Sequence, residues 1–339
     1  MSSRLLSLSG LVVLLAFGCN QGVPNPKPAE SKTASTTSTA PSTSSATTKP
    51  TTAPVATTTL GTVMPTAQVG NVGDPSGPEQ EMVELANRAR RDPIAEGNRY
   101  GLNLVGTPPA PPLATNALLA KAALAHAKDQ AVNKYYDHQN PNGGPDIEQQ
   151  VKNAGYAANG NSQNIDIGPV GLVDAKEEHK RFFVDEGVNP PGHRWNILSY
   201  SPPGTQPLIL REMGTSYIDG QMVAVGAVWD QYIVQNFGST ETDKPFVCGV
   251  VFTDANNTGE YDAGEGAKDV VVKLRATDGT AIAMTTRTAG AYAFEVLAPG
   301  DYVVEMVGGP FVRPVSLKVR VDAVNVKVDG VAGKGLVAR

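Results

Sequence analysis

The sequence predicts an α+β domain followed by a small all-β sandwich. Apolar residues recur at helical spacing between residues 76 and 186, and strand-like runs follow up to residue 238. After a polar break come short apolar segments separated by Gly, Asp and Pro. Helices followed by antiparallel strands are typical of a layered α+β domain, and a series of short strands is typical of a β-sandwich.

Composition limits the class of protein. The chain has 339 residues, a net charge of −5 and two cysteines, Cys19 and Cys248. This length suits two domains and a polar segment. Two cysteines exclude a disulfide-rich scaffold, and the lack of a basic block argues against nucleic acid as a partner. Cys248 begins an apolar segment, so we expect it to be a buried small side chain.

The first residues predict export and lipid attachment. Arg4 precedes an apolar run over 5–17 that is too short to span a bilayer and suits a signal peptide over residues 1–18. The run ends in Leu-Ala-Phe-Gly-Cys, which resembles a bacterial lipobox with Cys19 as the lipidated residue. We therefore expect a lipid-anchored, extracytoplasmic protein of the bacterial cell envelope, attached to the membrane through Cys19. The alternative is an ordinary secretory peptide and a secreted protein.

Residues 19–75 predict a disordered tether. This segment is largely Ser, Thr, Pro and Ala, so it cannot bury enough apolar surface to fold, and its prolines keep it extended. Such a tether would lift a domain away from a membrane. No later segment is apolar and long enough to cross a bilayer, so the lipid would be the anchor.

Residues 76–240 predict the α+β domain. Pro78 and Glu79 suit the first turn of a helix, which Asp92-Pro93 ends. Further helices are expected over 116–136, 145–153 and 173–186. Strands are expected over 213–218 and 222–237, on either side of Asp219-Gly220, a dipeptide that favours a hairpin turn.

The polar segment 239–245 predicts a linker, and the sandwich is expected over residues 246–325. Its strands are predicted at 247–252, 270–274, 291–296, 301–306 and 315–321. Residues 326–339 carry no motif and are expected to form a tail.

Two of the four histidines lie in sequences that suggest a site. His138 follows the 116–136 helix, and His193 lies in Pro-Gly-His-Arg-Trp-Asn-Ile-Leu, shortly after Glu186. Two neutral imidazoles can hold Zn²⁺ or a similar divalent metal, with water in the remaining positions. The alternative is that each histidine is structural and bonds a loop. We expect His126 to pack or to lie at the surface, and His179 to be solvated.

Four segments, in order, resemble the CAP superfamily of cysteine-rich secretory, antigen 5 and pathogenesis-related proteins, in its bacterial form. They are Asn87 to Arg90 in the first helix, His138 with Asn-Pro-Asn-Gly, Gly155-Tyr156 with Gln163-Asn164-Ile165, and Gly192-His193-Arg194 with Asn196-Ile197-Leu198. The resemblance covers about residues 79–238. It implies an α-β-α sandwich with a central cleft, lined by two histidines and two glutamates, that holds a divalent metal in some members.

Carried over to this chain, the resemblance implies a ligand cleft of His138, Gln163, Glu186 and His193. Gln163 departs from the family, because it stands where a glutamate is expected. An amide can form hydrogen bonds but cannot act as a general base. This departure counts against hydrolysis by a pair of carboxylates and favours ligand binding.

An acidic loop at 254–265 has the ligand spacing of an EF-hand calcium loop. Gly259 stands at loop position 6, and strand-like runs rather than helices flank the loop. The expected Ca²⁺ ligands are Asp254, Asn256, Thr258, Asp262 and Glu265, with the backbone carbonyl of Glu260. The alternative is a polar hairpin that binds no ion.

The region from 247 to 322 resembles the B-type domains of serine-aspartate-repeat adhesins and collagen-adhesin B modules. The matching segments are Val-Phe-Thr-Asp-Ala-Asn before the loop, Gly-Ala-Tyr-Ala-Phe at 290–294 and Leu-Ala-Pro-Gly-Asp-Tyr at 297–302. The resemblance implies an Ig-like or prealbumin-like β-sandwich with structural Ca²⁺, used as a spacer or stalk.

Three functions follow as hypotheses. The first is a surface-anchored, non-enzymatic CAP protein that binds an extracellular lipid, glycan, small molecule or protein ligand in its cleft. The second is a metal-dependent hydrolase or protease that acts on envelope or extracellular polymer, with Glu186 as base. The third is an adhesin, in which the CAP domain provides only a surface. Since one scaffold serves several activities, the fold alone does not choose between them.

Overall fold

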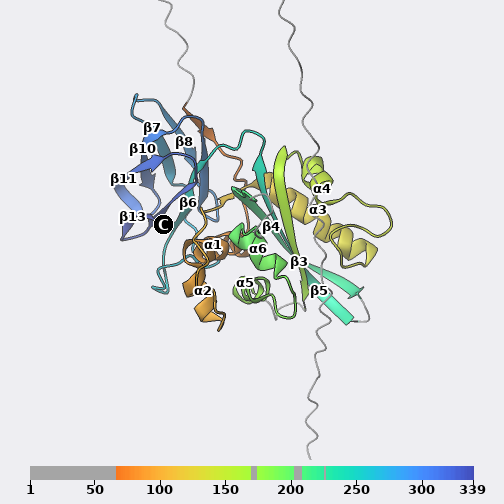
Figure 1. Cartoon of the computed structure of the whole chain (residues 1–339). Helices are drawn as coiled ribbons and strands as arrows, with labels where there is room; N and C mark the ends of the chain where they lie inside the picture. Colours follow the sequence, from red (N-terminus) through yellow and green to blue (C-terminus); the bar gives the residue numbers. More distant parts are fainter. Residues whose placement is uncertain (1–65, 169–173, 202–207, 225–226) are drawn as a thin grey trace, which may run out of the picture. The chain divides into compact units, whose positions relative to one another are not determined.

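The computed structural model describes residues 66–168, 174–201, 208–224 and 227–339, with only the backbone described between 219 and 230 (Figure 1). The predicted signal peptide, Cys19 and most of the predicted tether lie outside the described residues. Within the described part of the chain, no helix is long and apolar enough to cross a membrane.

The first domain contains six helices and a four-stranded sheet in the described residues. The helices are α1 (Gly77–Arg91), α2 (Pro93–Arg99), α3 (Ala117–Asn133), α4 (Ile147–Ala154), α5 (Ala175–Val184) and α6 (Gly192–Leu198). The strands are β2 (Ala114–Thr115), β3 (Ala158–Gly168), β4 (Glu212–Ala224) and β5 (Ala227–Thr240), in the order β2-β4-β5-β3. All four predicted helical regions are confirmed, and α2 follows the break at Asp92-Pro93.

Local sequence explains where the helices begin. Ser76 and Glu79 form a reciprocal capping box at the start of α1, and Asn116 caps α3 by accepting from two backbone N–H groups. Asp146 and Asp174 cap α4 and α5, and the side chain of each accepts from one backbone N–H group. The side chain of each capping residue takes up N–H groups that the first helical turn leaves without partners.

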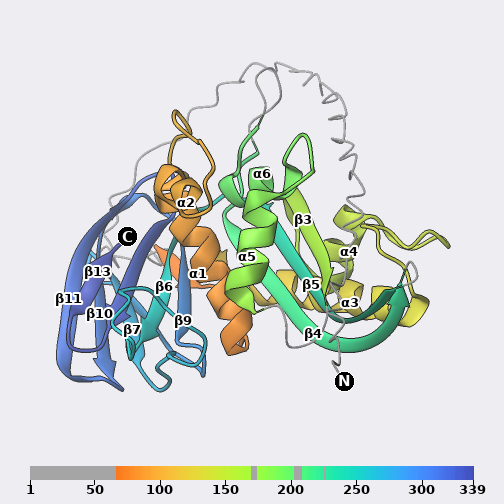
Figure 2. The same cartoon turned by 90° about the horizontal axis from the view of Figure 1, so that it is seen from below.

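The sheet has helices on both faces, which confirms the predicted α-β-α arrangement (Figure 2). Successive residues of β5 point to opposite faces: Ile233 and Phe237 pack against α1, α5 and α6, whereas Tyr232 and Val234 pack beside α3. On β4, a Cβ at Gly214 would lie 2.0 Å from the backbone nitrogen of Ala120, so glycine permits the close approach of α3.

The prediction of a hairpin turn at Asp219-Gly220 is wrong. β4 continues through this dipeptide to Ala224, which pairs with Ala227 of β5. The register shifts between Asp219 and Met222. An irregularity within the ladder therefore accommodates the Asp-Gly pair, and the strands reverse direction farther along the chain.

The second domain is a sandwich of two sheets, as predicted. One sheet has the order β1-β9-β6-β12-β13, and the other has the order β11-β10-β7-β8. The strands are β1 (Ala67–Val69), β6 (Phe246–Phe252), β7 (Val271–Ala276), β8 (Ala281–Thr285), β9 (Ala291–Val296), β10 (Gly300–Gly308), β11 (Phe311–Val321), β12 (Val326–Val331) and β13 (Gly335–Ala338).

Apolar residues from both sheets form the core of the sandwich. Val247, Phe294 and Val328 from one sheet pack with Leu274 and Val304 from the other, and all five are buried. Cys248 is buried and free, as expected for a small apolar side chain.

The sandwich extends beyond the expected boundaries at both ends. Residues 326–339, expected to form a tail, contain β12 and β13, and β12 pairs in parallel with β6. Residues 67–69, expected in the tether, form β1, which pairs antiparallel with β9. These short segments lack a recognisable pattern because their order comes from pairing with strands that are distant in sequence.

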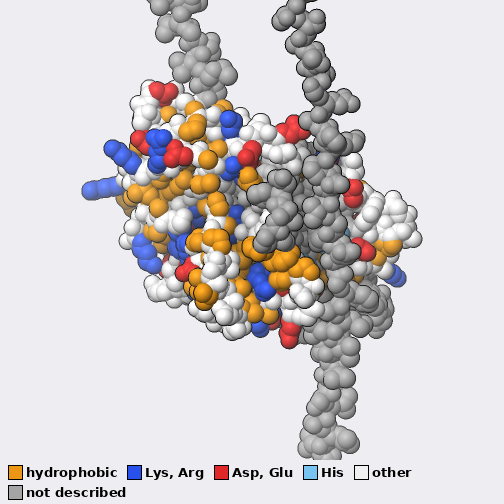
Figure 3. Space-filling model, viewed as in Figure 1, with side chains coloured by type: hydrophobic (Ala, Val, Ile, Leu, Met, Phe, Trp, Pro, Cys, Tyr) orange, Lys and Arg blue, Asp and Glu red, His pale blue; other side chains and the backbone are white. Residues whose placement is uncertain are grey.

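Charges of both signs are mixed over the face shown in Figure 3, among apolar side chains and without a block of one sign.

Ion pairs link the two domains. Lys327 of β12, only 3% exposed, contacts Glu84 of α1 at 2.8 Å. Arg91 of α1 contacts Glu260 of the 254–265 loop at 2.7 Å.

Candidate functional site

The CAP-like motifs converge beside strand β3. The side-chain amide of Asn196 in α6 donates to the Gln163 carbonyl at 3.3 Å and to Asn164 Oδ1 at 2.8 Å. Asn164 in turn donates to the carbonyl of His193 at 3.3 Å. The Gln-Asn pair and the His-Arg-x-Asn segment, which lie about thirty positions apart in sequence, are thus held together by buried amides.

His138 and Gln163 form the first pair of the site. His138 Nδ1 lies 2.9 Å from Gln163 Oε1. The orientation of the Gln163 amide is set by its nitrogen, which donates to Gln150 Oε1 at 2.8 Å and to Asn236 Oδ1 at 3.0 Å. Nδ1 of His138 must therefore carry the proton that reaches Gln163, which puts the ring's lone pair on Nε2.

Burial favours the neutral form of His138. Desolvation lowers the pKa of this imidazole, the hydrogen bond with Gln163 opposes the shift, and the nearby charge of His193 lowers the pKa further.

His193 and Asp185 form the second pair. Both carboxylate oxygens of Asp185 contact His193: Oδ1 lies 2.9 Å from Nδ1, and Oδ2 accepts the backbone N–H at 2.9 Å. Asp185 follows α5 in a left-handed conformation, with φ of 55°. The His193 ring packs against Phe182 with 5.1 Å between ring centroids, and its side chain is 16% exposed. A carboxylate on Nδ1 fixes the tautomer and orientation of an imidazole.

The carboxylate that reaches His193 is therefore Asp185, one position before the predicted Glu186. Glu186 is exposed. The sequence contains both acids side by side, and only the left-handed turn at the end of α5 decides which of them faces the histidine. Asn164, Gln150 and Asn236 were also not expected in the site, because buried amides have no distinctive sequence pattern.

The other two histidines are structural. His126 is buried in α3 and contacts the Asp137 carbonyl at 3.1 Å through Nε2. His179 is wholly buried, against the expectation that it is solvated, and its Nε2 lies 2.9 Å from Glu96 Oε1. Burial opposes ionisation of Glu96, but hydrogen bonds from His179 and Arg88 lower its pKa to about 2.

A pocket of about 340 Å³ lies between α3 and α4. It is bordered by α3, by the segment 140–145 and by Gln150 and Asn153 of α4. Gln150 links this pocket to the pair of His138 and Gln163, since its side-chain amide contacts Gln163 and the His138 carbonyl. A group bound in the pocket would thus lie one hydrogen-bonded residue away from Gln163.

Comparison with known proteins agrees with this geometry. Residues 83–201 match the model of the cysteine-rich secretory protein family, and residues 247–325 match that of the SdrD B-like domain. The chain carries a CAP domain followed by an SdrD B-like domain. Together they support an extracellular CAP protein with a β-sandwich spacer.

No curated protein matches the chain. Among solved structures, an outer surface protein from Borrelia burgdorferi is similar over 48% of this chain and 95% of its own length, with 13% identity and a TM-score of 0.30.

The donor set of the CAP site can be compared with that of a catalytic zinc site. Catalytic zinc usually has three protein ligands. Within the described residues, no three His, Cys, Asp or Glu side chains lie together in a way that could hold a metal ion. His138 and His193 would supply two of the three protein ligands of such a site.

The 254–265 loop of the SdrD B-like domain presents the expected calcium ligands only in part. Asp254 has a side chain that is 3% exposed, and its Oδ1 is buried with no hydrogen-bond partner in the described structure. Asn256 donates to Asp262 at 2.6 Å, and Glu265 accepts the backbone N–H groups of Ala255 and Asp262. Carboxylate and amide oxygens are ligand types that suit Ca²⁺. The unpartnered oxygen of Asp254 is the atom that would bind a cation.

Proposed function

We propose that this protein is a surface-anchored, extracytoplasmic CAP-domain lipoprotein that binds an extracellular lipid, glycan or peptide in the cleft beside His138 and His193. The observation that carries the proposal is the Gln163 amide. It bonds His138 and two further amides, so a fixed neutral dipole stands where a carboxylate base would be needed for hydrolysis.

Binding has a physical basis in this arrangement. Both imidazoles are held through Nδ1, so their opposite edges have fixed directions. A site whose polar groups are already oriented loses little entropy when a ligand binds. The pocket next to Gln150 supplies adjacent volume for part of the ligand. The sandwich would then serve as a spacer between the CAP domain and the anchor at Cys19.

Ligand binding can be tested by presenting the full chain to arrays of glycans and peptides and to lipid vesicles. We expect one class to be retained, and retention to fall at least about tenfold in the His138→Ala/His193→Ala double variant. Glu186→Gln is the matched control, because this neighbouring carboxylate is exposed, and it should bind like the wild type. Metal-dependent cleavage of the retained ligand by the wild type would contradict a purely binding role.

Hydrolysis is the second candidate, and the Asp185–His193 pair favours it. A carboxylate that orients an imidazole is the arrangement found in general bases. In this mechanism Asp185 takes the place that sequence analysis gave to Glu186. Turnover that disappears in Asp185→Asn but persists in Glu186→Gln would establish this alternative.

We further propose that Ca²⁺ binds the 254–265 loop and stabilises the sandwich. Support comes from the spacing of its oxygen ligands and from the buried, unpartnered Oδ1 of Asp254. The ion would hold the ends of the loop together next to β6.

A further inference from the structure

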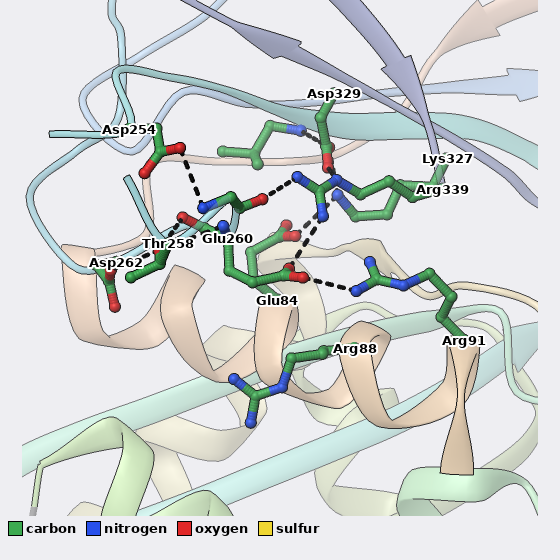
Figure 4. A network of polar contacts seen from close by, with 12 residues as sticks. Glu84, Arg88, Arg91, Asp254, Thr258, Glu260, Asp262, Lys327, Asp329 and Arg339 are labelled. Atoms are coloured by element: carbon green, nitrogen blue, oxygen red, sulfur yellow. Dashed lines mark hydrogen bonds and ion pairs between the residues drawn. The ribbon is translucent and has the colours of Figure 1, made fainter. Parts of the chain in front are cut away.

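The 254–265 loop lies at the boundary between the two domains. Figure 4 shows Asp254, Thr258, Glu260 and Asp262 of the loop beside helix α1 of the CAP domain. The backbone N–H of Ala263 donates to Glu81 Oε2 of α1 at 3.3 Å. The segment expected to bind calcium is therefore also a docking element between the domains.

Two lysines contact the carboxylates at positions 1 and 9 of the loop. Lys334, between β12 and β13, lies 2.7 Å from Asp254 Oδ2. Lys176, from helix α5 of the CAP domain, contacts Asp262 Oδ1 and lies 3.7 Å from Glu81 Oε1. Each ammonium group neutralises a carboxylate that a bound cation would otherwise neutralise.

Two arginines pair with a third acidic residue of the loop. Glu260 contacts Arg91 of α1 at 2.7 Å and Arg339 of the C-terminal end at 3.1 Å. With the two lysines, four basic side chains from outside the loop face its acidic residues. The carboxylates of Asp254 and Asp262 are drawn towards different lysines, which explains why the described acidic side chains do not converge on one point.

We propose that Lys176 and Lys334 act as built-in cations of the 254–265 loop: without Ca²⁺, Lys176 holds the loop against the CAP domain and Lys334 holds it against the β12–β13 turn, and the charge of both lysines opposes Ca²⁺ binding. This inference rests on the proposed Ca²⁺ site. It adds that Ca²⁺ binding is coupled to domain docking through Lys176, because the Asp262 carboxylate that pairs with Lys176 would also have to bind the ion. By linkage, docking and Ca²⁺ binding oppose each other to the same extent.

The test is calorimetric melting of the full chain in EDTA and in millimolar Ca²⁺, together with Ca²⁺ titration. We compare the wild type with Lys176→Met and Lys334→Met, which keep the length of the side chain but remove its charge. Lys180→Met is the matched control, because Lys180 lies on the same helix, is exposed and pairs with Glu177 of its own helix rather than with the loop.

In EDTA, both lysine variants should melt below the wild type and the control. In Ca²⁺, they should gain more in melting temperature than the wild type, because ligand stabilisation grows with affinity. Each should bind Ca²⁺ about tenfold more tightly once the competing charge is gone.

Two outcomes would overturn the proposal and are distinguishable. If the wild type and all variants bind Ca²⁺ equally well, the calcium site stands but the lysines do not compete for it. If neither the wild type nor any variant responds to Ca²⁺, the calcium site itself fails, and the competition fails with it.

Discussion

At the residue scale, the CAP site shows how neighbouring acids acquire different roles. Asp185 and Glu186 are adjacent and chemically alike, but only Asp185 contacts His193, through both of its oxygens. The left-handed backbone at the end of α5 directs its side chain back towards α6. Such a choice depends on a single backbone angle, which composition and spacing do not reveal.

A buried carboxylate at the start of β4 predicts a pH dependence of stability. Burial raises the pKa of Glu212 to about 7, although hydrogen bonds from Asn116 and Tyr156 oppose the shift. The folded state therefore binds a proton more tightly than the unfolded state, whose carboxyl has a pKa near 4.5. The contribution of Glu212 to the free energy of unfolding should therefore decrease as the pH rises from about 4.5 to about 7, by up to about 3 kcal/mol.

The Glu212→Gln variant checks this pH dependence. Glutamine resembles the protonated acid, so the stability of the variant should not decline over this pH range. The variant should also be more stable than the wild type at pH 8. Urea unfolding at pH 5 and pH 8 measures the effect. Equal slopes with pH for the two proteins would show that Glu212 is ionised in the folded protein at both pH values.

At the element scale, the contact between α3 and β4 depends on one glycine. A Cβ at Gly214 would lie 2.0 Å from Ala120 N and 2.5 Å from the Leu119 carbonyl carbon, both in helix backbone. Neither atom can move without displacing the helix. Gly214→Ala should therefore lower the free energy of unfolding by about 3 kcal/mol or more.

The matched control for Gly214 is Gly192→Ala. A Cβ at Gly192 meets nothing within 4 Å and its backbone needs no left-handed conformation, so stability should change by less than about 1 kcal/mol. Thermal and urea unfolding of both variants measure the difference. A Gly214→Ala protein as stable as its control would mean that α3 packs farther from the sheet.

Elements differ in how well the sequence predicts them. The helices have caps and an apolar face, so Ser76, Asn116 and Asp174 mark where three of them begin. Strand β3 has no such signal, because Gln163 and Asn164 occupy its buried positions and are satisfied by other amides. The motifs single out His138 and His193, whereas the amides around them emerge only from the fold.

At the scale of the whole molecule, the CAP domain is inserted into the sandwich. Strand β1 precedes the CAP domain, the other sandwich strands follow it, and β1 pairs with β9 in one sheet. Lys327 of β12 contacts both Asp329 and Glu84 of α1. Since a buried lysine that loses its partners is costly, the two domains should stabilise each other.

The last fourteen residues test this mutual dependence. A chain that ends at residue 325 lacks β12 and β13, so it loses the parallel partner of β6, the buried Val328 and the Lys327 contact with α1. We expect the sandwich to lose its cooperative melting transition and β6 and β9 to exchange amide hydrogens rapidly. The CAP domain should melt at a lower temperature than in the full chain.

A chain that ends at residue 334 is the matched control, since it removes the edge strand β13 but keeps β12 and Lys327. It should retain a cooperative sandwich with reduced stability, because Arg339 and its contacts with Asp329 and Glu260 are lost. Calorimetry and hydrogen exchange of the three chains measure the series. If the chain ending at 325 melts like the full chain, then β12 is dispensable, the sandwich is complete at residue 325, and the CAP domain gains no stability from it.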